Sequence, residues 1–133
     1  MKWMWILSAS AVLVSHSGAA TQEQCRELLR RGLEDKNPET RKEAVVAVSL
    51  AAQRGPLFAR LEEMLQDKDV EVRQAVVVSL AEVKNKGSTA ALRKALEDEV
   101  PEVSFTAARA LWARNDPVGK RALLAVLARE SKT

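Results

Sequence analysis

The sequence predicts an all-α protein, a right-handed α-solenoid of about three and a half helix pairs. Its apolar residues recur at a nearly constant interval, because Leu33, Leu65, Leu96 and Leu127 lie 32, 31 and 31 residues apart. Each interval contains two segments with apolar residues three and four positions apart, the spacing of one face of an α-helix. Glycine, proline and asparagine separate these segments at regular places. Such a unit buries its apolar face only by stacking on its neighbours.

The first helix of each unit is predicted from two leucines four residues apart. A short turn follows, in which Asn37 and Asp69 are good N-caps for the second helix. Val100 occupies the equivalent place in the third unit and has no side-chain acceptor. We therefore expect the third turn to be the weakest, unless Asp98 or Glu99 reaches the free amides. The leucine pairs are Leu29 and Leu33, Leu61 and Leu65, and Leu92 and Leu96.

The second helix of each unit carries apolar or small residues that cluster on about a third of the helix surface. The small residues Ala47, Ser79 and Ala110 predict a close approach of neighbouring helices. The second-helix residues are Thr40, Ala44, Ala47, Val48 and Ala51, then Val72, Val76, Ser79, Leu80 and Val83, then Val103, Ala107, Ala110 and Leu111.

The units are predicted at residues 22–53, 56–85 and 88–114, with a half unit at 117–130. The half unit is one helix, which we expect to cap the array. Continuation of a longer array beyond Thr133 is the alternative. The apolar residues of the half unit that we expect to cover the third unit are Leu123, Val126 and Leu127.

Residues 1–20 are predicted to be a secretory signal peptide, set apart from the repeat domain at 21–133. Lys2 precedes an uncharged apolar run, and Gly18 and Ala20 are small residues of the kind that signal peptidase requires. We expect cleavage after Ala20, export to the periplasm or the extracellular space, and no membrane span once the signal is removed. A signal anchor is the alternative, and the signal type suggests a bacterial source.

The composition argues against several kinds of chemistry. The single histidine, His16, lies in the predicted signal, so the repeat domain lacks the commonest metal ligand and acid–base catalyst. The carboxylates are spread one cluster per unit and do not converge as a calcium site needs. Without Lys2 the net charge falls from +3 to about +2, which is too small to favour nucleic acid. We predict no enzyme activity, no catalytic or metal site and no cofactor.

Two further features have plain structural explanations. Cys25 is the only cysteine and falls in register with Leu57 and Ser88, so we expect a partly buried, inert thiol. Acidic residues gather at the turn inside each unit and basic residues at the opposite edge, where the dipole of the second helix favours each. The basic residues are Arg54, Lys84, Lys86, Arg114, Lys120 and Arg121; the acidic ones are Glu34, Asp35, Glu39, Asp67, Asp69, Glu71, Asp98, Glu99 and Glu102.

The pattern of Asp67, Val72, Arg73, Ser79 and Leu80 resembles the HEAT repeat family, here in the form of a secreted bacterial HEAT repeat domain protein. The resemblance implies a ladder of hydrogen bonds in which turn aspartates and helix arginines join adjacent units. Ser104 stands where the third unit would have its arginine, so we expect the ladder to lapse there. The ladder residues are Asp35, Arg41, Asp67, Arg73 and Asp98.

The outward positions of the second helices are the candidate partner-binding surface, since second helices line the concave side of such solenoids. Phe105, Arg109 and Trp112, with Val46 and Val78, have the character of an anchoring surface for a protein or peptide. The alternative is that these residues fill gaps between stacked units, or meet a segment of chain beyond Thr133. The outward positions are Lys42, Val45, Val46 and Ser49, then Gln74, Val77, Val78 and Ala81, then Phe105, Ala108, Arg109 and Trp112.

The predicted function is an exported, non-enzymatic protein–protein interaction scaffold, because an extended curved surface offers contact area without an enclosed pocket. Two alternatives stay open. One is a structural subunit of an envelope complex. The other is a lyase-like or chaperone-like role of the kind found in some relatives of this fold, for which no residue here argues.

Overall fold

The computed structural model describes residues 17–51 and 55–130, and over these residues the chain is helical apart from turns. The all-α solenoid predicted from the repeat is confirmed. Most of the predicted signal peptide, residues 1–16, lies outside the described residues. None of the described helices is long and apolar enough to cross a membrane. The helices are α1 (Ser17–Leu33), α2 (Pro38–Ala51), α3 (Pro56–Glu63), α4 (Val70–Glu82), α5 (Lys86–Ala95), α6 (Pro101–Ala113) and α7 (Pro117–Glu130), and a short 3₁₀ turn, η1 (Met64–Gln66), extends α3.

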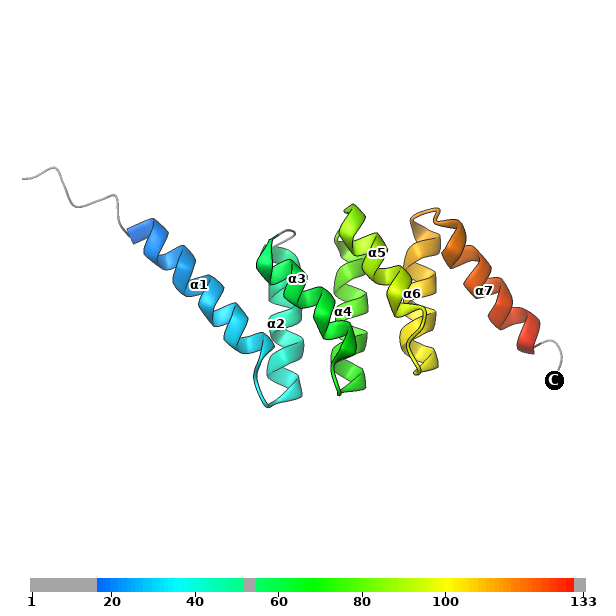
Figure 1. Ribbon diagram of the computed structural model, residues 1–133, viewed down its shortest axis with the longest axis horizontal. Coiled ribbons are helices and arrows are strands. Elements are labelled where there is room, and N and C mark those ends of the chain that lie inside the picture. Colours follow the sequence, from blue (N-terminus) through cyan, green and yellow to red (C-terminus); the bar gives the residue numbers. More distant parts are fainter. Residues whose placement is uncertain (1–16, 52–54, 131–133) are drawn as a thin grey trace, which may run out of the picture.

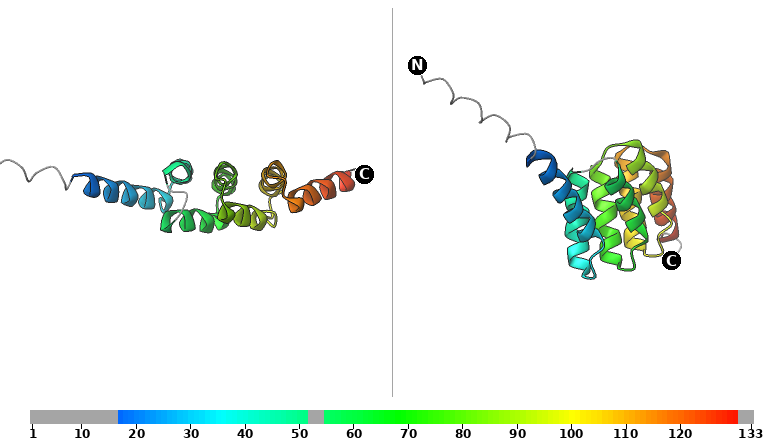
Figure 2. Two further views of the ribbon diagram at one scale, coloured as in Figure 1. Left: turned by 90° about the horizontal axis from the view of Figure 1, so that it is seen from above. Right: turned by 60° about the vertical axis from the view of Figure 1, so that its left-hand side comes forward.

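The helices form two layers (Figure 1). The inner layer consists of α2, α4 and α6, which lie side by side and contact one another in sequence order. The outer layer consists of α1, α3, α5 and α7. Seen from above, the inner helices are viewed end-on and both ends of the molecule curve toward them (Figure 2). The inner layer therefore lies on the concave side.

Side-chain oxygens at the turns fix where the inner helices begin. The Asp69 carboxylate accepts hydrogen bonds from the amides of Glu71 and Val72, so α4 has a true N-cap. Val100 offers no such acceptor, and α6 begins without a side-chain N-cap. The Asp98 carboxylate accepts the Val100 amide at 2.9 Å, as Asp67 accepts the Asp69 amide in the turn before, so this bond closes the turn but does not replace the cap.

The core lies between the layers and also between neighbouring inner helices. Its fully buried residues include Leu61, Leu80 and Leu111. Val45 and Val77 are fully buried as well, and Ser49 and Ala108 nearly so. The expectation that these four residues face outward was wrong, because each inner helix packs sideways against the next and so buries a wider stripe than two-layer packing alone requires.

The last helix packs on α6 mainly through its first turns. A Cβ atom at Gly119 would lie 2.6 Å from the backbone nitrogen of Trp112, so only glycine permits this close approach. Toward Glu130, α7 runs away from α6 (Figure 1). Leu123 is half-buried, but Val126 is 40% exposed and does not cover the third unit as expected. The side chain of Leu127 lies outside the described residues.

Cys25 is exposed, which contradicts the prediction of a partly buried thiol. The register with Leu57 and Ser88 assumed that the whole of each first helix is covered by a neighbouring unit. The N-terminal half of α1 projects beyond α2, and no described unit precedes it (Figure 1).

Candidate functional site

A ladder of arginine–aspartate pairs joins the units at the edge that holds the turns. Arg41 of α2 donates from Nε and Nη2 to the two carboxylate oxygens of Asp67 in the next unit, both at 2.8 Å. Its Nη1 donates to the backbone oxygens of Asp35 at 2.9 Å and Lys36 at 3.1 Å. One guanidinium therefore holds two consecutive turns in register.

Arg73 repeats this arrangement one unit later. It donates to the two carboxylate oxygens of Asp98 at 2.8 and 3.2 Å, and to the backbone oxygen of Asp67 at 2.8 Å. Both side chains of the pair are only 8% exposed. At the first turn, the Asp35 carboxylate accepts the amide of Asn37 within its own turn.

The third unit departs from the ladder in the way that Ser104 allows. The Ser104 hydroxyl donates to the backbone oxygen of Pro101 inside α6. The next turn aspartate, Asp116, is instead paired with Arg93 from the outer helix α5, with its Oδ2 at 2.6 Å from Nη2. Asp116 is buried whereas Arg93 is half exposed. Sequence reasoning did not identify this pair, because Arg93 lies outside the repeated pattern.

The ladder carboxylates have lowered pKa values. Burial alone would raise the pKa of Asp98, but the hydrogen bonds from Arg73 and from the Val100 amide outweigh it and hold the pKa below its usual range. Hydrogen bonds from Arg41 and the Asp69 amide lower the pKa of Asp67 in the same way, against the effect of burial. The ladder is therefore ionised at neutral pH and makes a structural contribution.

Arg114 closes the opposite edge, where the sequence pattern predicted basic residues but not the acceptors that they bind. Its Nη2 donates to the backbone oxygens of Leu80, Ala81 and Val83, at 2.7, 2.8 and 2.9 Å, where α4 ends. Its Nη1 donates to the hydroxyls of Ser88 and Thr89. Burial lowers the pKa of Arg114 and outweighs the attraction of the Glu82 carboxylate, which would raise it. The arginine thus satisfies carbonyls that a helix C-terminus leaves free.

Replacing Arg114 with lysine is expected to lower the free energy of unfolding by about 1–2 kcal/mol. A single lysine ammonium cannot reach both the backbone oxygens at the end of α4 and the two hydroxyls of α5, which the planar guanidinium binds together. Chemical denaturation measures the loss. The matched control is Arg121→Lys, at an exposed position of α7, for which we expect a change within about 0.5 kcal/mol. Equal effects of the two substitutions would contradict the capping role.

The candidate binding residues meet on the concave side. Val46, Val78 and Arg109 occupy equivalent positions of α2, α4 and α6, while Phe105 and Trp112 flank Arg109 one turn away on either side. We call these five residues the inner-face strip. Val46 and Val78 are each 49% exposed, Phe105 is 44% exposed and Trp112 58% exposed. The described residues therefore leave large parts of these four apolar side chains uncovered.

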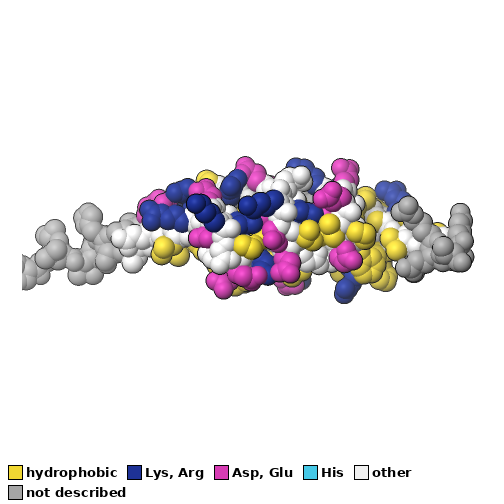
Figure 3. All heavy atoms as spheres, turned by 90° about the horizontal axis from the view of Figure 1, so that it is seen from below, with side chains coloured by type: hydrophobic (Ala, Val, Ile, Leu, Met, Phe, Trp, Pro, Cys, Tyr) yellow, Lys and Arg dark blue, Asp and Glu magenta, His cyan; other side chains and the backbone are white. Residues whose placement is uncertain are grey.

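Polar contacts between inner helices border the strip. Lys42 Nζ lies 2.9 Å from Glu39 and 2.6 Å from Glu71 of the next unit, and these two carboxylates raise the pKa of Lys42. Gln74 donates to the hydroxyl of Thr106 at 2.8 Å. Figure 3 shows acidic side chains along this margin, with hydrophobic side chains beside them toward the C-terminal end. The strip is thus an apolar surface with a charged border.

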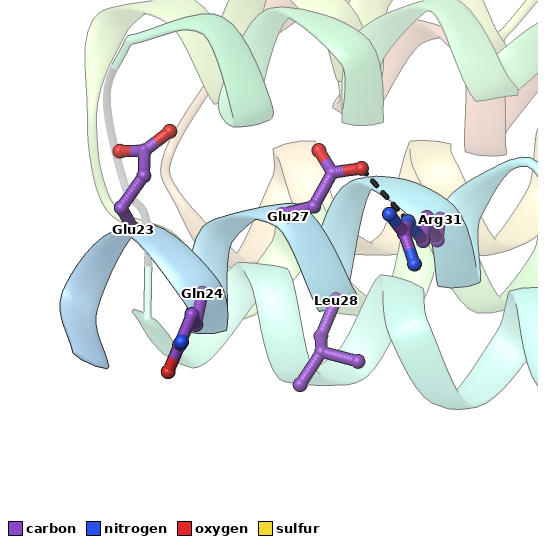
Figure 4. Close-up of a pocket in the computed structure, with 5 residues that line it drawn as sticks. All are labelled: Glu23, Gln24, Glu27, Leu28 and Arg31. Atoms are coloured by element: carbon purple, nitrogen blue, oxygen red, sulfur yellow. Dashed lines mark hydrogen bonds and ion pairs between the residues drawn. The ribbon is translucent and has the colours of Figure 1, made fainter. Parts of the chain in front are cut away.

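Two hollows lie on the surface of the described residues. One lies along α1, lined by Glu23, Gln24, Glu27, Leu28 and Arg31, and Figure 4 shows that all five side chains come from that single helix. Hydrogen bonds from Arg30 and Arg31 lower the pKa of Glu27 to about 2. A second hollow covers the Arg73–Asp98 pair at the turn edge. Within residues 17–51 and 55–130, no group of histidine, cysteine and carboxylate side chains could hold a metal ion.

Comparison with known proteins gives two family matches. The family described as HEAT repeats matches residues 58–133, more than half of the chain. The family described as non-SMC mitotic condensation complex subunit 1 matches residues 9–93. None of the curated proteins matches the chain.

Proposed function

Because this chain belongs to the HEAT repeat family, we propose that it is a non-enzymatic scaffold that binds a protein or peptide on its inner-face strip. HEAT repeats generally mediate protein–protein interaction. The observation that carries the proposal is the exposure of Phe105 and Trp112 on either side of Arg109, because aromatic and arginine side chains dominate the binding energy of many interfaces. Val78 and Val46 extend the same surface across the two preceding units.

Replacing Phe105 and Trp112 together with alanine is expected to abolish partner capture, at a cost in stability of at most about 1 kcal/mol per site. The measurement compares proteins recovered on immobilised wild type and variant, and thermal unfolding of each. The control variant carries Leu28→Ala and Leu124→Ala, which remove exposed apolar side chains from the outer layer. Equal recovery on both variants, or a large loss of stability, would argue that the aromatic pair is structural.

The same experiment separates a scaffold from a subunit. Recovery of one partner in a fixed ratio would favour the structural subunit of a complex, and the match to a family of complex subunits supports keeping that alternative.

We further propose that residues 1–20 direct export. Mass spectrometry of the protein from its native source tests this, since cleavage after Ala20 leaves Thr21 as the first residue.

A further inference from the structure

We infer that the segment bound on the inner-face strip is a basic amphipathic segment of a partner protein. Its apolar side chains would lie against the strip, and its lysine or arginine side chains over α2 and α4. This inference rests on the proposed function, because it specifies the chemistry of the ligand for the same surface. It follows from the charges that surround the strip.

Glutamates line the strip at its N-terminal border. Glu39, Glu71 and Glu102 are the second residues of the three inner helices, and all three are exposed. Each precedes a strip position, Val46, Val78 or Arg109, by seven residues and so lies on the same helix face two turns away. The border is therefore a row of carboxylates that runs parallel to the apolar row.

The remaining charges make the inner layer more acidic than the outer layer. The inner helices carry four basic residues, of which Arg41 and Arg73 are buried in the ladder and Lys42 is already bound by two glutamates. Five glutamates of these helices are exposed, against two cations outside the ladder, Lys42 and Arg109, which leaves an excess of three negative charges. The outer helices carry ten basic residues against five glutamates, although the whole chain has a net charge of only +3. The concave side is thus the acidic side of a basic protein, and it complements a basic ligand.

The apolar part of the ligand argues against a second copy of this chain as the occupant. The outer layer of a second copy would supply the basic charge, but α3 and α5, at its centre, expose no large hydrophobic side chain, and the exposed Leu28 and Leu124 lie on α1 and α7 at its two opposite ends (Figure 1). The strip runs across three helices and needs a partner with both features along one continuous surface. An amphipathic segment that lays an apolar stripe into a groove, with charged residues beside it, has them.

Arg109 determines which helices the basic part of the ligand covers. It is exposed, and none of the described residues is hydrogen-bonded or ion-paired to its side chain. Its positive charge opposes basic side chains over α6, so the basic part of the ligand lies over α2 and α4. Phe105 and Trp112 then receive the most apolar part of the ligand.

The test uses the full chain with Trp3→Phe and Trp5→Phe, which leaves Trp112 as the only tryptophan and hence as a fluorescent reporter on the strip. Three synthetic helical peptides share one leucine pattern and carry lysine, glutamine or glutamate at the remaining positions. We expect the lysine peptide to shift the Trp112 emission to the blue and to bind about tenfold more tightly than the glutamate peptide. Added salt should reduce that preference.

Two matched variants locate the charge effect. Glu39→Gln, Glu71→Gln and Glu102→Gln together are expected to weaken binding of the lysine peptide about fivefold or more, partly because Lys42 loses its partners. Glu23→Gln, Glu63→Gln and Glu97→Gln change the net charge equally on the outer helices and the turns, and should change binding less than about twofold.

The outcomes separate the inference from the function on which it rests. Equal binding of the three peptides, with loss in the Phe105→Ala variant, overturns the inference and leaves the scaffold function standing. Failure of the lysine peptide to bind overturns the inference, as does equal weakening by both glutamate variants. Self-association that depends on Phe105, seen by sedimentation, would identify a second copy as the occupant and also overturn it.

Discussion

Replacing Asp98 with alanine is expected to lower the free energy of unfolding by about 3–5 kcal/mol, because the substitution leaves the guanidinium of Arg73 buried without its counter-charge. Arg73 is 8% exposed and donates two hydrogen bonds to Asp98. Chemical denaturation followed by circular dichroism measures the loss. Because each unit contacts only its neighbours, we expect the transition to broaden as the third unit uncouples from the second.

Asp116→Ala is the matched control for this substitution. Asp116 accepts a turn amide two residues later, as Asp98 does, and is equally buried. Its partner Arg93, however, is 53% exposed and regains water when the carboxylate is removed. We expect a loss of about 1–2 kcal/mol. Equal losses for the two aspartates would contradict the view that burial of the arginine decides the cost.

The pH dependence gives a second measurement of the Asp98 effect. A carboxyl group whose pKa is lowered by folding contributes stability above its ordinary pKa of 3.8, and that contribution is lost as the pH falls through the folded-state pKa. The wild type should therefore lose stability below about pH 4. The Asp98→Ala variant should lose less over the same range, because it has one fewer such group.

Replacing Gly119 with alanine is expected to detach α7 from α6 and to lower the free energy of unfolding by about 3 kcal/mol. The added Cβ would lie 2.6 Å from Leu111 Cβ and from the Trp112 backbone nitrogen, and 2.7 Å from the Ala108 backbone oxygen. Backbone atoms cannot rotate away, so the helices must separate. Hydrogen exchange of the α7 amides, together with denaturation, measures the change.

Gly87→Ala is the control for steric crowding. Its Cβ would meet Phe58 Cε1 at 3.2 Å and the ends of two other side chains, which can move by a few tenths of an ångström. We expect a change of less than about 1 kcal/mol and unaltered exchange in α7. Normal protection of α7 in the Gly119→Ala variant would show that the close approach is not needed to hold the last helix.

The fold class could be predicted from the sequence because its apolar residues recur at a regular interval. Leucines four residues apart and a repeat interval of 31 or 32 residues specify helix pairs and their stacking. The resemblance also named five ladder residues, of which the structure brings four together in two pairs, Arg41 with Asp67 and Arg73 with Asp98, while the Asp35 carboxylate bonds within its own turn. Side chains at fixed repeat positions are visible to this kind of reasoning because each unit presents them again.

Contacts that break the period could not be predicted in the same way. Arg114 binds backbone oxygens about 30 residues earlier, and a backbone acceptor leaves no trace in residue identity. Val45 and Val77 lie at the edge of the buried stripe, where the sideways packing of inner helices, not their amphipathicity, decides burial. The exposure of Cys25 depends on what lies before the first unit, and the register between repeats does not contain that information.

The two arginines that join the second and third units have a consequence for ligand binding. Arg73 fixes these units at the turn edge and Arg114 fixes them at the opposite edge, so α4 and α6 are held at both ends. The distance between Val78 and the aromatic pair on α6 is therefore set before any ligand arrives. Such a preorganised surface loses little conformational entropy on association, and a larger share of its contact energy remains as affinity.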